Sequence, residues 1–142
     1  MKIKITLLTL TFLLPFVVFS QCITMAREQC VPKLAPYTQN GQLNSSPIHA
    51  GESVELEVTF NSGMDYRIFV CAQANLGKVS FRPFDVEKNL VFDSKSAGSP
   101  EFWDFNVAST QQFTIEVNIP KSNAPDKPVP YGCITVIVGF ME

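Results

Sequence analysis

The chain has 142 residues, of which 46% are hydrophobic, and it carries 11 Lys and Arg against 13 Asp and Glu. Without the two lysines of the first twenty residues, nine basic residues face thirteen acidic ones, a net charge of −4. We expect no nucleic-acid partner, because phosphate binding requires clustered positive charge. A chain of this length suits one domain with one hydrophobic core.

The first twenty residues, MKIKITLLTLTFLLPFVVFS, have the pattern of an export signal. Lysines precede an apolar run of about fifteen residues that contains Pro15, whereas a helix that spans a bilayer needs roughly twenty. We therefore predict a cleavable signal peptide over 1–20 and no transmembrane segment after cleavage. The expected location is secreted, periplasmic or cell-surface.

All four cysteines follow residue 20: Cys22, Cys30, Cys71 and Cys133. Export places a chain in an oxidising compartment, so two disulfides are expected within a single disulfide-stabilised domain over 21–142. A lipoprotein anchored at Cys22 is the alternative, and the two residues before that cysteine fit a lipobox poorly.

The stretch CITMAREQC, residues 22–30, is the one plausible helix, of a turn or two, ended by Pro32 and Pro36. Residues 38–51 form a polar loop in this interpretation, and everything after them has strand and turn chemistry. No stretch offers the helical crossovers of a parallel β/α fold.

SVELEVTF, residues 53–60, alternates between an apolar and a polar face and predicts a half-buried strand. The turn cluster NSG at 61–63 leads into DYRIFVCAQ at 65–73, so the two strands are expected to form an antiparallel hairpin.

Two predicted strands, 65–73 and YGCITVIVGFM at 131–141, are apolar on both faces. If they are antiparallel neighbours, one outer face carries a patch of Phe69, Cys71, Cys133 and Ile137. Leaving that patch in water would forfeit about 25 cal/mol per Å² of burial. We expect residues 22–34 to cover it, through Ile23, Met25, Val31 and Leu34.

Other strands are predicted at 78–86, 89–94, 102–107 and 112–120, with loops at 95–101 and 121–130. Pro83 indicates that the first of these strands lies at a sheet edge or contains a bulge, because proline cannot donate to the ladder. Seven or eight strands separated by turn signals indicate an all-β fold, a two-sheet antiparallel β-sandwich of the jelly-roll type, with a short amino-terminal helical or irregular segment packed on one sheet.

The disulfide connectivity stays open. The preferred pairing joins Cys71 to Cys133 across neighbouring strands and Cys22 to Cys30 as a local loop. If residues 22–30 are helical, however, the Cα atoms of Cys22 and Cys30 lie about 12 Å apart, beyond the roughly 7 Å that a disulfide tolerates. Each would then bond one of the two strand cysteines.

No catalytic constellation is found, and we expect neither catalysis nor a cofactor. His49 is the sole histidine and no Gly-x-Ser-x-Gly motif is present, so His49 is interpreted as a loop residue at one end of the sandwich. A hydrolase would need an acid pair drawn from Asp85, Glu87, Asp93, Glu101 and Asp104. Asp85, Asp93 and Asp104 are also the candidates for a calcium site.

Aromatic residues near strand ends are the candidates for ligand binding: Tyr37, Tyr131 and Trp103, with Phe102 beside them. Such rings stack on sugars or anchor protein partners. For Trp103 a role in the core is favoured, because it shares a strand face with Phe105 and Val107.

The runs HAGESVELEV, DYRIFVCAQ, VSFRPFD, FTIEVNIP and CITVIVGF, over about residues 48–140, resemble the bacterial pre-peptidase C-terminal type of β-sandwich and other jelly-roll accessory modules. The resemblance implies a non-enzymatic accessory role and no catalytic residues. The leading hypothesis is a secreted or periplasmic module that binds a protein or glycan partner through loops or an edge strand. The alternatives are a structural or assembly subunit of a cell-surface complex, and a hydrolase with an unrecognised carboxylate pair.

Overall fold

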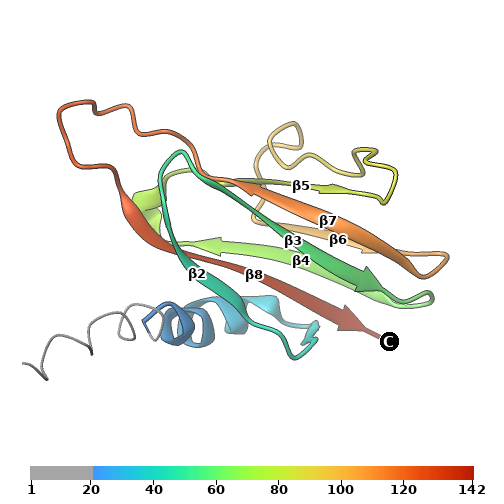
Figure 1. Cartoon of the computed structure of the whole chain (residues 1–142). Coiled ribbons are helices and arrows are strands. Elements are labelled where there is room, and N and C mark those ends of the chain that lie inside the picture. The colour runs from blue at the N-terminus through green and yellow to red at the C-terminus, as the bar shows by residue number, and fades with distance from the viewer. Residues whose placement is uncertain (1–20) are drawn as a thin grey trace, which may run out of the picture.

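The computed structural model describes residues 21–142, so the predicted signal peptide at 1–20 lies outside the described residues. Two antiparallel sheets pack face to face (Figure 1), which confirms the predicted β-sandwich. One sheet, here sheet A, has the order β1-β8-β4-β6, with β2 also paired to β8, and sheet B has the order β3-β7-β5. The strands are β1 Thr38–Gln39, β2 Asn44–His49, β3 Ser53–Phe60, β4 Asp65–Ala72, β5 Ser80–Phe84, β6 Phe102–Asn106, β7 Gln111–Asn118 and β8 Tyr131–Met141. Within 21–142, no helix is long and apolar enough to cross a bilayer.

The predicted hairpin of β3 with β4 is wrong, because the two strands belong to different sheets. β3 pairs along its whole length with β7, whereas β4 pairs with β8 and β6. The turn between them carries the chain from one layer to the other, and it is held by Tyr66, whose hydroxyl oxygen accepts a hydrogen bond from the Asn61 N–H at 2.8 Å. An apolar inner face suits a strand of either sheet, so alternation alone does not select the partner.

β4 and β8 are antiparallel neighbours, as predicted, with Cys71 opposite Thr135 and Phe69 opposite Ile137. Their inner faces enter the sandwich core with Ile68, Val70, Val136 and Val138. Their outer faces form a second apolar cluster around Phe69 and Ile137, both nearly inaccessible to solvent. Both strands are therefore buried on two sides, which is why neither shows polar alternation.

The outer cluster is covered by the amino-terminal residues 21–34, called the lid from here on. The lid is helical throughout, as α-helix at 21–25, then η1 Ala26–Cys30 and η2 Val31–Leu34, and it lies beside β2 and β8 (Figure 1). Met25 and Leu34 are buried against the sheet and Val31 is partly buried, as predicted. Ile23, expected in the same cluster, is instead exposed. Pro32 does not end the helical segment but lies in the first turn of η2, where a missing N–H costs no hydrogen bond.

The preferred disulfide pairing is wrong, and the alternative holds. Cys22 bonds Cys133 and Cys30 bonds Cys71, with Cα–Cα distances of 5.3 and 5.9 Å. Because residues 22–30 are helical, the two lid cysteines are kept apart, and each reaches one strand of sheet A. The lid is thus covalently joined to both central strands.

Two further predictions are wrong, one because a mostly polar segment pairs through its backbone at a sheet edge and the other because an apolar segment does not join a sheet. Residues 38–51 are not a loop: they contain β1 and β2, and β2 pairs with residues 131–136 of β8. Residues 89–94 are not a strand and form only an isolated bridge, Phe84 to Leu90. Of the two explanations given for Pro83, the edge position of β5 is the one that the structure shows.

Candidate functional site

The three aspartates considered for calcium, Asp85, Asp93 and Asp104, hold local structure. Asp93 accepts hydrogen bonds from the Lys95 N–H at 3.0 Å and the Ser96 hydroxyl at 3.1 Å, and Asp104 pairs with Arg67. In the part of the chain that the structure describes, no three His, Cys, Asp or Glu residues are grouped to hold a metal ion.

The pKa shifts of carboxyl groups are also unlike those of a general acid, which requires a raised pKa. Hydrogen bonds from the Asn89 backbone and side chain lower the pKa of Asp85. Hydrogen bonds from Asn118 and Arg82 lower the pKa of Glu116. Both groups are held as carboxylates.

Two of the predicted aromatic candidates, Tyr37 and Phe102, meet on the outer face of sheet A through Arg67. The guanidinium carbon of Arg67 lies 4.5 Å from the centroid of the Tyr37 ring and 4.2 Å from that of Phe102. Its Nε and Nη2 donate to the two carboxylate oxygens of Asp104 at 2.6 and 2.7 Å. These four residues are called the Arg67 cluster. Arg67 was missed by the sequence analysis, although its position opposite Asp104 on β6 follows from the strand register.

The side chains of the Arg67 cluster already contact one another, which leaves few groups free to bind a ligand. The hydrogen bond to Asp104 raises the pKa of Arg67, and burial together with the Asp104 charge raises the pKa of Tyr37. Phe102 is 43% exposed, but the guanidinium stacks on it. A sugar or aromatic ligand would have to displace that contact, so the cluster is better suited to holding β6 and Tyr37 against β4 than to binding.

Trp103 points to the inner side of β6, and its predicted role in the core is confirmed. Its ring stacks with Phe92 at 4.8 Å and with Phe105 at 4.2 Å between centroids. Tyr131 lies at the opposite end of sheet A, exposed, with its ring centroid 4.7 Å from that of His49. His49 is the last residue of β2 and not a loop residue, and its N–H donates to Glu52 at 2.8 Å.

An exposed apolar hairpin was missed by the sequence analysis. Residues 84–91, called the apolar hairpin, turn back from β5 and leave Val86 74%, Leu90 51% and Val91 40% exposed. Asp85 fixes the turn: one carboxylate oxygen accepts from the backbone N–H groups of Glu87 at 2.9 Å and Asn89 at 2.8 Å. Aliphatic side chains on a turn that is already ordered are typical of a protein-binding surface.

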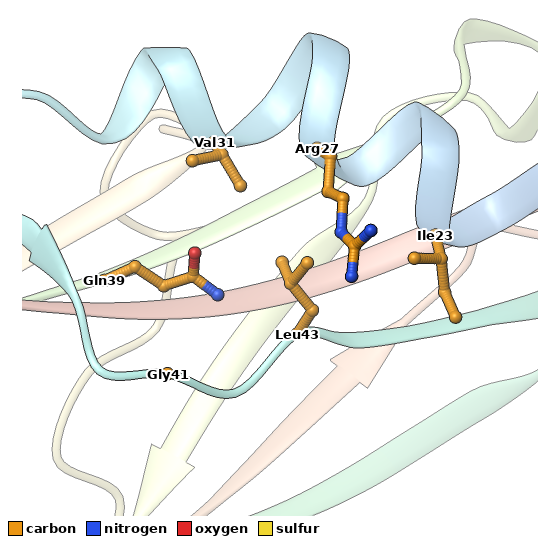
Figure 2. Close-up of a pocket in the computed structure, with 6 residues that line it drawn as sticks. All are labelled: Ile23, Arg27, Val31, Gln39, Gly41 and Leu43. Carbon is orange, nitrogen blue, oxygen red and sulfur yellow. The ribbon is translucent and has the colours of Figure 1, made fainter.

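A cavity of about 470 Å³ lies between the lid and the β1–β2 connection (Figure 2). Its lining residues are Ile23, Arg27, Val31, Gln39, Gly41 and Leu43. Figure 2 shows the Arg27 guanidinium reaching from the lid toward Leu43. One cation among aliphatic side chains could receive a small amphipathic anion, but the Arg27 side chain is exposed to solvent, which weakens its attraction for an anion.

No protein-family model matches this sequence, and no curated protein does. Among solved structures, the crystal structure of Aeromonas hydrophila PliG, a periplasmic lysozyme inhibitor of g-type lysozyme, is similar with a TM-score of 0.50 and 10% identity, over 70% of this chain and 85% of that one. A solution NMR structure of a de novo designed double-stranded β-helix matches 70% of this chain and 99% of its own, with a TM-score of 0.34 and 16% identity. At these identities the similarity to PliG concerns the fold alone. The resemblance to pre-peptidase C-terminal domains stays a prediction.

Proposed function

We propose that this protein is a non-enzymatic extracytoplasmic module that binds a protein partner through the apolar hairpin. The observation that carries the proposal is the exposure of Val86, Leu90 and Val91 on a turn that Asp85 holds in place. Because the turn is ordered before binding, little conformational entropy would be lost when a partner covers it. Central aliphatic anchors of this kind carry much of the free energy of protein interfaces.

The location rests on the predicted signal peptide and on the two disulfides, which persist in oxidising compartments. A protein partner is favoured over a glycan, because three of the four aromatic candidates are occupied within the described chain: Arg67 engages Tyr37 and Phe102, and Trp103 packs against the core. Only Tyr131 of these four is exposed without such a contact, beside His49. PliG is described as a periplasmic inhibitor of g-type lysozyme, so g-type lysozyme is the first partner to test.

The test compares Val86→Asp with Val129→Asp. Val129 is 57% exposed and lies in the β7–β8 loop, at the end of the sandwich opposite the apolar hairpin (Figure 1), so the two variants carry the same chemical change at separate places. Binding to immobilised g-type lysozyme, and to a panel of secreted hydrolases, is measured by biolayer interferometry. We expect Val86→Asp to weaken binding by about tenfold or more and Val129→Asp to leave it within about twofold.

Equal binding by the wild type and Val86→Asp would remove the hairpin from the interface. Absence of binding to every protein of the panel would count against the proposed function itself. The far-ultraviolet circular dichroism and thermal unfolding of both variants show whether each is folded, because both positions are exposed and neither substitution should unfold the domain.

A further inference from the structure

β3 is an exposed edge strand with few of the features that normally protect an edge. It is eight residues long and, within residues 21–142, pairs only with β7. The sequence SVELEVTF contains neither proline nor lysine, the residues that most often block edge pairing. The other edges are shorter or contain proline: β2 has Pro47, β5 has Pro83 and β6 has five residues. Every second residue of β3 therefore presents its backbone N–H and C=O away from β7.

A groove of about 300 Å³ runs beside this edge, between β3 and sheet A. Its lining residues are Asn44, Ser45, Ser46, Val54, Glu55, Leu56, Ile134 and Val136. Val54 and Leu56 belong to the inner face of β3 and are only partly buried. Ile134 and Val136 of β8 belong to the sandwich core. If an added peptide strand paired with the edge of β3, its inward-facing side chains would bury the exposed parts of these residues.

The outer face of β3 is acidic. Glu55 and Glu57 are exposed and form no ion pair with a residue of the described chain. The carboxylate directly opposite Glu55 on β7 is Glu116, which is already paired with Arg82. Two uncompensated negative charges therefore line the edge and would favour a positively charged neighbour.

The same charges disfavour a second copy of this chain at the edge. Pairing two β3 strands antiparallel over nearly their full length, with both outer faces outward, places Glu55 of each copy opposite Glu57 of the other. Like charges directly opposite each other destabilise a strand pair. The acidic β3 edge therefore favours a strand with basic residues over a second β3 strand.

We propose that the β3 edge binds an extended peptide segment of a partner, with alternating apolar and basic residues, by strand addition. The apolar side chains enter the groove against Val54 and Leu56, and the basic side chains lie beside Glu55 and Glu57. Eight residues of extended chain span about 27 Å, which sets the length of the segment. This site is separate from the apolar hairpin, because β3 and β5 are opposite edges of sheet B.

The probe is a fluorescein-labelled peptide of about nine alternating lysine and valine residues, titrated with the full chain in fluorescence anisotropy. We expect the double variant E55K/E57K to weaken binding by about tenfold or more at low salt, because attraction becomes repulsion. Glu101→Lys, a single charge reversal at an exposed residue before β6, should leave the affinity within about twofold. A peptide with glutamate in place of lysine should not bind.

Strand addition itself is tested by N-methylation, which removes backbone donors without changing side chains. Two peptides are made, each methylated at one of the two alternating sets of residues. One set would face β3 and the other would face solvent, so one peptide should lose binding and the other should keep it.

The proposal is overturned if both methylated peptides bind like the parent, if Glu101→Lys weakens binding as much as E55K/E57K, or if the parent peptide does not bind. A wild-type dimer in sedimentation that is strengthened in E55Q/E57Q, where the like charges are removed, would instead assign the edge to a second copy. Val86→Asp should bind the peptide normally, so failure here and failure of the proposed hairpin interface can be told apart.

Discussion

Removing either disulfide should cost several kcal/mol, with the larger cost at Cys22–Cys133. The two bonds span sequence separations of 111 and 41 residues. Closing loops of these sizes lowers the entropy of the unfolded chain by roughly 16 and 13 cal/mol/K, which corresponds to about 4.8 and about 3.9 kcal/mol at 25 °C. All four cysteines are buried, so alanine leaves small cavities that add to both costs.

The double variants Cys22→Ala with Cys133→Ala, and Cys30→Ala with Cys71→Ala, are compared with the wild type in urea unfolding followed by circular dichroism. Either variant keeps the lid attached through the other bond, so each should still unfold in one cooperative transition. A loss below about 1 kcal/mol in both variants would refute the loop-closure reasoning. Peptide mapping under non-reducing conditions that joined Cys71 to Cys133 would refute the pairing itself.

Three further expectations concern single side chains. Gly139→Ala should destabilise the fold by about 1–3 kcal/mol in chemical unfolding, because its Cβ would lie 2.8 Å from the Cβ of Tyr37. Gly132→Ala meets first the side-chain oxygens of Asn75 and Gln73, which can shift more easily than a Cβ fixed to the backbone, and should cost less. Arg67→Lys should lower the unfolding midpoint although it keeps the charge, since lysine cannot reproduce the bidentate contact; an unchanged midpoint would contradict this. Glu116 has a lowered pKa when folded, so the stability lost in Glu116→Gln should be full above the unfolded pKa and vanish as pH falls through the folded value, measured by urea unfolding between pH 7 and pH 2.

The alternation of side chains along two strands was enough to predict that β4 and β8 are neighbours in the middle of a sheet, between the core and the lid. In β4 and β8 both faces are apolar, which required a core on one side and a cover on the other. Within residues 21–142, the lid was the only unassigned segment with suitable apolar residues, and it is where the inference placed it. A local sequence pattern indicates burial directly, because apolar residues are found mainly on the strand faces that are shielded from water.

Pairing between strands could not be predicted in the same way. Whether β3 joins β4 or β7 depends on backbone hydrogen bonds that any strand can make, so the turn signal at 61–63 pointed to the wrong neighbour. β2 was missed because its residues are mostly polar, and it is held at an edge by β8 rather than by burial of its own side chains. The apolar hairpin gave no signal, because Val86, Leu90 and Val91 have the composition of a buried strand and only tertiary structure leaves them exposed.

The covalent bonds and the proposed binding surfaces occupy different parts of the same sandwich. Both disulfides attach to β4 and β8, the inner strands of sheet A, and the lid together with the Arg67 cluster covers the outer face of that sheet. The apolar hairpin and the β3 edge belong to the two sides of sheet B, where no disulfide attaches. A partner that bound at either edge of sheet B would therefore contact residues that can be substituted without changing the disulfide-bonded strands of sheet A. If both proposals hold, the exposed residues that contact a partner lie mostly on the edges of sheet B, although the groove beside β3 is also lined by Ile134 and Val136 of β8. Substitutions of the exposed residues Val86, Glu55 and Glu57 are then expected to change binding with little loss of fold stability.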